Sequence, residues 1–414
     1  MSSIRFSRRA RATGGVVAAV VVLWLAGSVL PADAAQRPRP RPTATASVVG
    51  GCGFTIAASP NASTLDNTLA DVAAVSTSDA WAVGQYSTDG YGAVRTLIQH
   101  WNGTAWSTVP SPNRYAGTGH GEFNSLHGVA AISANDVWAV GYSYSNDQPQ
   151  QTLVLHWNGS TWTIVPSPSY TFPGAYNTLL DVSGTAADDV WAVGGSPTPG
   201  YAARGLLLHW NGAAWSIVPG PPNFEFFGSS TRTGVVAVAR NDVWAVGDFD
   251  PWHFDGTGWT VPAVGAQNAT AVHAAGPGAV WAVRTSLYRT SDGETFGPYP
   301  VGAHFTGGAW QSSSVATLDK GSFNGVTVRS NTDVIGVGSA GLFTLALRFD
   351  GTTWQPVTTG NANPAPNTNR QDGNVLLSAA GTGTTTWAVG YYYNGSGNGT
   401  DYGVRRTLIE RRTC

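Results

Sequence analysis

Short apolar runs alternate with turn residues along most of the chain, and the same arrangement recurs at a nearly regular spacing. The clearest copy reads DVWAVG over Asp136–Gly141, HWNGSTW over His156–Trp162 and VPSP over Val165–Pro168. The central tryptophan of this pattern recurs at Trp81, Trp138, Trp191, Trp244, Trp281 and Trp387, with Ile335 at its place in the sixth copy. Seven copies of this length predict one supersecondary unit repeated into an array or a ring.

Each copy predicts four short strands, which in the second copy are Gly128–Ser133, Val137–Tyr142, Thr152–Trp157 and Trp162–Val165. The first two strands of a copy are apolar at both alternating sets of positions, which indicates burial on both faces. A ring of radially packed, four-stranded antiparallel sheets provides that burial. The pattern therefore predicts an all-β, seven-bladed β-propeller, and the density of turn and β-branched residues excludes a helical repeat.

The third and fourth strands of a copy are joined by an Asn-Gly or Asp-Gly hairpin, whose glycine supplies the positive φ of a tight turn. We expect the six intact hairpins to begin at Trp101, Trp157, Trp210, Phe254, Ser291 and Phe349. The turns between the first two strands end at Asp79, Asp136, Asp189, Asp242 and Asp333. These aspartates are expected to bond the backbone of their own turns, which is a structural role.

The seventh copy is incomplete, because the chain ends after the strands around Trp387 and Leu408. The missing fourth strand is found at the other end, where Phe54–Asn61 aligns with Trp106–Asn113. We expect this N-terminal strand to complete the last blade and close the ring. The same alignment places Cys52 and Cys414, which are the two cysteines of the chain, side by side in the turn that this blade lacks. A disulfide between them is predicted, as an exported protein permits.

The N-terminus carries the pattern of an export signal. Arg5 to Arg11 supply the charged start, Gly14–Leu30 the apolar run and Ala32–Ala34 a small-residue cleavage site. The expected organisation is a signal peptide over residues 1–35, a Pro/Arg-rich linker over 36–51 and the propeller over 52–414. A twin-arginine signal and an uncleaved membrane anchor are the open alternatives. We expect an extracellular, secreted protein, with association to the cell surface left open.

The net charge and the sequence motifs limit the kinds of partner and cofactor that we expect the chain to bind. The net charge is −2, with 22 basic and 24 acidic residues among 414, so no basic surface for nucleic acid or an acidic membrane is present. His100, His156, His209 and His253 share one repeat position and are expected to be scaffold, whereas His120, His127, His273 and His304 are unrepeated. No metal-ligand spacing, phosphate loop or nucleophile elbow occurs. We predict no cofactor, no metal site and no catalytic residue.

The loops between the second and third strands, and between copies, are long and variable, and the predicted geometry gathers them on one face. Variable loops on a rigid scaffold commonly carry binding. The ligand-binding candidates there are Tyr86, Tyr91, Tyr115, His120, Tyr144, Tyr170, Phe172, Tyr176, Tyr201, Phe226, Tyr392 and Tyr402. A second group, expected at the channel mouth, comprises Asn67, Asp71, Asn124, Asn177 and Asp181. This second group would bind a polar ligand or a cation, or would cap strand ends.

The DVWAVG, HWNGxxW and VPSP elements resemble those of exported propeller-repeat proteins of the actinobacterial type, over residues 52–414. More distantly the chain is similar to WD-repeat, Kelch and sialidase-type propellers. The resemblance implies the fold and says little of activity, because the arginine triad and the Tyr/Glu nucleophile pair of sialidases cannot be placed in this sequence.

These observations favour a monomeric, secreted binding module that recognises a glycan or an extracellular protein through the long-loop face. Tyrosine suits such a face, because it combines a flat apolar ring with a polar tip. Two alternatives stay open. One is a polysaccharide-active hydrolase or lyase with its site at the channel mouth, and the other is a structural surface module.

Overall fold

The structure is a computed structural model in which the chain divides into two units, Met1–Ser47 and Val48–Cys414. It describes residues 52–90, 92–116, 121–172, 174–198, 201–220, 225–226, 233–248, 250–289, 295–315, 318, 320–363, 373–395 and 403–414. The expected signal peptide and linker lie outside the described residues. Every regular element in the described part is a β-strand, and no helix long and apolar enough for a membrane span occurs there.

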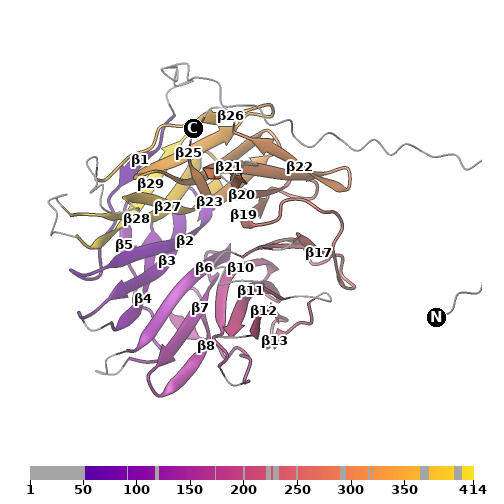
Figure 1. Ribbon diagram of the computed structural model, residues 1–414. Helices are drawn as coiled ribbons and strands as arrows, with labels where there is room; N and C mark the ends of the chain where they lie inside the picture. Colours follow the sequence, from indigo (N-terminus) through magenta and orange to yellow (C-terminus); the bar gives the residue numbers. More distant parts are fainter. Residues whose placement is uncertain are drawn as a thin grey trace, which may run out of the picture. The chain divides into compact units, whose positions relative to one another are not determined.

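The strands form antiparallel groups of four, in which chain neighbours pair with one another (Figure 1). The first two groups are β2 (Asn67–Ser76), β3 (Asp79–Ser87), β4 (Val94–Trp101) and β5 (Trp106–Thr108), followed by β6 (Phe123–Ser133), β7 (Asp136–Ser145), β8 (Gln148–Trp157) and β9 (Trp162–Ile164). One parallel residue pair, Val94 with Phe123, links these two groups into an eight-stranded sheet.

The next three groups each form a separate sheet, in strand order along the chain. The third group is β10 (Thr178–Ala186), β11 (Asp189–Thr198), β12 (Tyr201–Trp210) and β13 (Trp215–Ile217), with β14 (Glu225–Phe226) added on β12. The fourth group is β15 (Gly234–Ala239), β16 (Asp242–Val246), β17 (Trp252–Phe254) and β18 (Trp259–Thr260). The fifth group is β19 (Ala269–Ala274), β20 (Val280–Arg289), β21 (Thr295–Thr306) and β22 (Ala309–Ser314).

The last two groups include the strand that comes from the other end of the chain. The sixth group is β23 (Ser322–Ser330), β24 (Asp333–Ala340), β25 (Phe343–Phe349) and β26 (Trp354–Pro356). The final sheet has the order β1 (Thr55–Ala57), β29 (Arg405–Thr413), β28 (Thr385–Tyr393) and β27 (Asn374–Thr382). In Figure 1 the indigo β1 accordingly lies beside the yellow β29.

The pairing of β1 with β29 has the expected register, since Thr55 faces Arg411 as Ser107 faces His100 in the first group. The predicted disulfide is also present. Cys52 is bonded to Cys414, with 5.9 Å between their Cα atoms and a sequence separation of 362. The prediction of an all-β fold of four-stranded antiparallel sheets is therefore confirmed, whereas the number of blades and the closure of the ring stay predictions.

One predicted hairpin, in the fifth copy, lies at a different segment of the chain. In the fifth copy the turn between the third and fourth strands lies at Gly307-Gly308 and not at Ser291, and Phe305 pairs with Trp310 across it. Both glycines have positive φ, 60° and 80°, which is the backbone that a two-residue hairpin requires. The correction also moves His304 into the repeated histidine position, opposite Trp281.

The repeated tryptophans form the contacts between neighbouring groups. The ring of Trp81 lies 5.0 Å from that of Trp157 and 5.4 Å from that of Trp162, both of which belong to the next copy. The same contact recurs along the chain and also joins the last group to the first, where Trp387 lies 4.9 Å from Trp101. Large aromatic rings packed edge to face stabilise such interfaces well.

The repeated histidines and aspartates form a second scaffold contact within four of the copies. Nε2 of His156 lies 2.8 Å from Oδ1 of Asp136, and the imidazole stacks on Trp138 with 4.2 Å between ring centroids. His100, His209 and His253 repeat this arrangement with Asp79, Asp189 and Asp242. The scaffold role of these residues agrees with the prediction, although the partner of the aspartate is a histidine and not the backbone of its own turn.

Candidate binding face and central cavity

The innermost strands of the seven groups contact one another in chain order. β2 contacts β6, and the series continues through β10, β15, β19 and β23 to β27, which in turn contacts β2. Residues from all seven of these strands line one cavity of about 620 Å³. Each innermost strand forms part of the cavity wall. The side chains that line the cavity are therefore the first candidates for a binding or catalytic site.

Two aspartates face the cavity from β2 and β10. Asp71 and Asp181 occupy the same repeat position, directly after a β-bulge in each strand. Oδ2 of Asp71 accepts a hydrogen bond of 2.7 Å from the backbone N–H of Val129, on the next group. Oδ2 of Asp181 accepts the equivalent bond, 2.8 Å, from Val235. These carboxylates therefore join neighbouring groups.

The remaining oxygens of the two aspartates are also bonded. Oδ1 of Asp71 accepts from Oγ of Ser378 at 2.5 Å, which links the first group to the last, and Oδ1 of Asp181 accepts from the N–H of Val182 at 2.8 Å. Burial among the inner strands raises the pKa of Asp71 to about 6 despite these bonds. Burial raises the pKa of Asp181 well above its ordinary value, and the nearby charge of Asp71 adds to the effect.

Two histidines line the same cavity. Burial lowers the pKa of His127 and of His273 to about 4, so both rings are neutral at pH 7. Nδ1 of His273 accepts a hydrogen bond from the N–H of Val328 on β23, at 3.2 Å. Its Nε2 is then the protonated nitrogen of the neutral ring. The cavity thus offers hydrogen-bonding groups with little fixed charge beyond the aspartates.

Further polar side chains of the inner strands bind the neighbouring group. Ser183 Oγ accepts from the N–H of Ala237, and Nδ2 of Asn324 donates to the carbonyl oxygen of Leu376. Thr327 Oγ1 accepts from the N–H of Gly381. The polar wall of the cavity is therefore largely engaged in holding the groups together, which limits how many of its side chains a ligand can reach.

The asparagines expected at the channel mouth have a different place from the aspartates. Asn67, Asn124 and Asn177 are buried and are not among the residues lining the cavity. Oδ1 of Asn124 accepts from the N–H of Arg114, and its Nδ2 donates to the carbonyl oxygen of Tyr115. Each asparagine thus fastens the loop that precedes its strand. Asn374 fastens the loop before β27 in the same way. It occupies the same repeat position as the other three asparagines, so the sequence pattern could have predicted its role.

One aromatic candidate of the loop face belongs to a row of stacked rings. Tyr144 stacks on Phe123 with 4.8 Å between centroids and 8° between planes, and lies parallel to Tyr142 at 6.2 Å. Tyr142 in turn stacks on His127 at 5.5 Å. The row runs from the first residue of β6 to a residue that lines the cavity. We call Phe123, Tyr144, Tyr142 and His127 the aromatic row.

The other described candidates are dispersed. Tyr170 lies 5.7 Å from Phe172 and donates its hydroxyl to the carbonyl oxygen of Gly205, while Tyr176 is 46% exposed. Tyr86 and Tyr392 pack against the cores of their sheets. The backbone of Tyr115 is held by Asn124.

The remaining candidates cannot be placed as side chains. Tyr91, His120 and Tyr402 lie outside the described residues, and of Tyr201 and Phe226 only the backbone, on β12 and β14, belongs to the described part. A cluster that the sequence reasoning missed joins β28 to β29. The guanidinium of Arg405 lies 4.8 Å from the ring of Tyr391, and its Nε donates to the hydroxyl of Tyr393 at 2.8 Å. Among the described residues no group of three or more His, Cys, Asp or Glu side chains is placed to hold a metal ion.

Fold and cavity together define an all-β protein of four-stranded antiparallel sheets whose innermost strands share one cavity. No family model matches the chain, and no curated protein matches it. A fungal lectin from Aleuria aurantia, described as a six-bladed β-propeller, has 10% identity and a TM-score of 0.39, with 83% of this chain and 95% of the lectin covered.

Two further solved structures resemble the chain to a similar degree. The endosialidase of phage phi92 has 10% identity and a TM-score of 0.47, with 87% of this chain and 69% of that chain covered. An α-L-arabinofuranosidase of Fusarium graminearum has 8% identity and a TM-score of 0.43, with coverages of 87% and 97%. At these identities and TM-scores the likenesses carry no argument about ligand, reaction or number of blades.

Proposed function

We propose that the chain is a secreted, seven-bladed β-propeller that binds a glycan where the aromatic row meets the central cavity. Three observations support seven blades in a closed ring. The described residues form seven groups of four strands, and the innermost strands contact one another in a cycle that returns from β27 to β2. Trp387 of the last group packs on Trp101 and Trp106 of the first.

The aromatic row is the observation that carries the glycan proposal. A sugar ring has an apolar C–H face, which packs on aromatic rings, and hydroxyls, which need neutral hydrogen-bonding partners. Burial raises the pKa of Tyr142 and of Tyr144, so both keep neutral hydroxyls at physiological pH. The chain as a whole is poor in charge, with 22 basic and 24 acidic residues among 414.

A glycan array tests the proposal directly. The wild-type protein should bind a defined set of glycans, and Tyr144→Ala should weaken that binding by up to about tenfold, because a stacked aromatic contact contributes about 0.5–1.5 kcal/mol. Phe343→Ala, which removes an exposed aromatic ring on the hairpin of the sixth group, is the control and should leave binding unchanged. A blank array together with retention of an extracellular protein would assign this face to a protein ligand instead.

The secretion part of the proposal rests on the signal-like sequence and on the disulfide. Expression with the native N-terminus should give a culture-medium protein that begins after Ala34 or Ala35. A full-length protein retained in the membrane fraction would indicate an anchor and contradict cleavage.

The pair of aspartates favours a second candidate, a polysaccharide hydrolase. Acid/base hydrolysis of a glycoside needs one protonated and one ionised carboxyl group, and raised pKa values on two neighbouring carboxyls can provide them. Glycans retained on the array would then be cleaved in solution, and Asp181→Asn would abolish cleavage while preserving binding. Intact glycans after prolonged incubation would leave the binding module as the function.

A further inference from the structure

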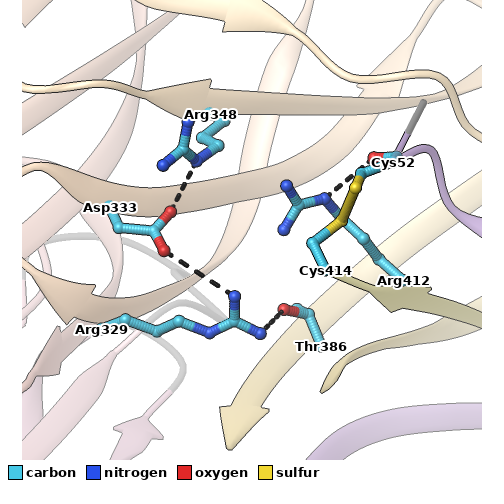
Figure 2. Close-up of a disulfide and its surroundings, with 7 residues drawn as sticks. All are labelled: Cys52, Arg329, Asp333, Arg348, Thr386, Arg412 and Cys414. Carbon is cyan, nitrogen blue, oxygen red and sulfur yellow. Dashed lines mark hydrogen bonds and ion pairs between the residues drawn. A yellow bond between two sulfur atoms is a disulfide. The ribbon is translucent and has the colours of Figure 1, made fainter. Parts of the chain in front are cut away.

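We propose that a second site, separate from the cavity, binds a dianionic oxyanion such as phosphate or sulfate beside the disulfide. Two arginines pair there with one aspartate, and the guanidinium of a third arginine lies between this aspartate and the disulfide (Figure 2). Nε of Arg348 lies 2.6 Å from Oδ1 of Asp333, and Nη1 of Arg329 lies 3.7 Å from Oδ2. Arg412 approaches from β29, where its Nε donates to the carbonyl oxygen of Cys52 at 3.0 Å.

The charges of this cluster do not balance. Three guanidinium groups and one carboxylate leave two positive charges, in a chain whose overall net charge is −2. Burial lowers the pKa of Arg412, and the charges of Arg329 and Arg348 lower it further, while Asp333 acts in the opposite direction. A buried charge without compensation is costly. An anion with two negative charges would compensate the excess.

Arg412 also has donor capacity that the described residues leave unused. The residue is 7% exposed, and its Nη1 is buried without a hydrogen-bond partner in the described part of the chain. Nε of Arg329 is buried and equally without a partner there, although its Nη2 donates to Oγ1 of Thr386 at 2.8 Å. A buried donor without an acceptor costs free energy, and guanidinium groups pair with oxyanions in strong, charge-assisted hydrogen bonds.

The repeat shows that the scaffold does not require these arginines. In the other six copies the position of Arg412 is aromatic, and the position of Arg348 is histidine in five. The aromatic of each such position packs on the central tryptophan of the preceding copy, and the preceding copy here has Ile335 in place of that tryptophan. Arg348 keeps the contact with the aspartate that histidine makes in other copies. Arg412 instead stands where the scaffold has an aromatic ring, and this departure from the repeat points to binding.

The cluster can be reached from solvent through Arg348, whose side chain is 38% exposed. Inorganic phosphate and inorganic sulfate are the probes for a calorimetric titration of the full, oxidised protein, at constant ionic strength with chloride as the reference. We expect saturable binding of one ion per chain. Arg412→Gln and Arg348→Gln should each weaken it by about tenfold or more, because each removes a charge-assisted contact. Arg240→Gln, which changes an exposed arginine paired with Asp188, should leave it unchanged.

The source of the anion is resolved by a parallel titration with dextran sulfate. Binding of both inorganic sulfate and dextran sulfate indicates a site for the free ion. Binding of dextran sulfate alone indicates sulfate esters of a polymer, each of which carries one negative charge, so that two esters would supply the charge of one dianion. In either case dependence on Arg348 is required. The proposal is overturned if the folded wild type binds none of these probes, or if Arg348→Gln binds them as tightly as the wild type does. If Arg412→Gln does not fold, Arg348→Gln still tests the proposal. Arg348 is the more exposed residue, so we expect its replacement to disturb the fold less.

Discussion

At the residue scale, the carboxyl group of Asp71 links three groups of strands by hydrogen bonds, but its ionisation destabilises the folded state. Its two oxygens join the first group of strands to the second and to the last. Its raised pKa means that the folded state holds the proton more tightly than the unfolded chain does. Ionisation of Asp71 therefore lowers the free energy of unfolding, and the full loss is present above pH 6.

Asp71→Asn tests this cost. Below pH 3.8 the carboxyl group is protonated in both the folded and the unfolded state and does not change the free energy of unfolding. Above pH 6 it is ionised in both states, and the free energy of unfolding is lower by at most about 3 kcal/mol, at 1.36 kcal/mol per unit of pKa difference. Asparagine keeps one acceptor for Val129 and one donor for Ser378. The stability of the variant relative to wild type should therefore rise between pH 4 and pH 7, as measured by urea unfolding.

The comparison with wild type is needed because His127 and His273 act in the opposite direction. Their lowered pKa values destabilise the folded state as the pH falls from 6.5 towards 4. Asp255→Asn, at an exposed turn, is the control and should show a flat difference over the range between pH 4 and pH 7. A difference for Asp71→Asn that is independent of pH would contradict the raised pKa.

The sequence singles out Asp71 and Asp181 by their positions, but it does not reveal their environment. Three of the hydrogen-bond partners named above, Val129, Val235 and Ser378, belong to neighbouring groups 54 to 307 residues away. Burial by those groups raises the pKa values of both aspartates. The sequence did not predict the aromatic row, for a related reason. His127 and Tyr142 are distant in the repeat pattern, and only the antiparallel pairing of β6 with β7 brings their rings together.

At the scale of elements, an asparagine in four of the groups fastens the preceding loop to the start of an innermost strand. Asn124→Ala removes the acceptor for the N–H groups of Arg114 and Tyr115 and the donor to Tyr115. Because Asn124 is buried, water cannot replace these bonds, and the free energy of unfolding should fall by about 2–4 kcal/mol.

Asn102→Ala provides the comparison for this prediction. Asn102 also accepts two backbone hydrogen bonds, but it lies in an exposed hairpin turn where water can take its place. Its replacement should cost about 1 kcal/mol or less in the same urea titration. Equal losses for the two variants would show that the buried asparagine does not fasten its loop.

Element boundaries follow the apolar pattern closely where the repeat is intact. The four strands expected in the second copy are present as β6 to β9, although three of them extend further into the loops. The fifth copy departs because two glycine-containing turns compete for the same role. Composition favoured the Asp-Gly segment, whereas the cross-strand pairing of Phe305 with Trp310 fixes the turn at Gly307-Gly308.

At the scale of the whole molecule, the disulfide joins Cys52 to Cys414, 362 positions apart in the sequence. Cross-linking so long a loop restricts the unfolded chain, and removal of a native disulfide typically costs about 2–5 kcal/mol. The double variant Cys52→Ser, Cys414→Ser should show that loss in the free energy of unfolding. Reduction of the wild type should reproduce it, and reduction of the variant should have no effect.

An unchanged stability in the double serine variant would contradict the role of this bond. The disulfide itself followed from the sequence alone, because the alignment of Phe54 with Trp106 fixes where both cysteines lie in the incomplete copy. The ligand does not follow from the repeat, since the repeat specifies the scaffold. Binding depends on the positions where copies differ, and their arrangement in space is set by the fold.

The central claim, a glycan held by the aromatic row at the cavity, is tested most directly by a crystal structure of the protein with a glycan selected on the array. The account predicts electron density for a sugar ring against Tyr144 and its stacked neighbours, with further residues directed towards the cavity. Density on the outer edges of the sheets, with the aromatic row unoccupied, would contradict it.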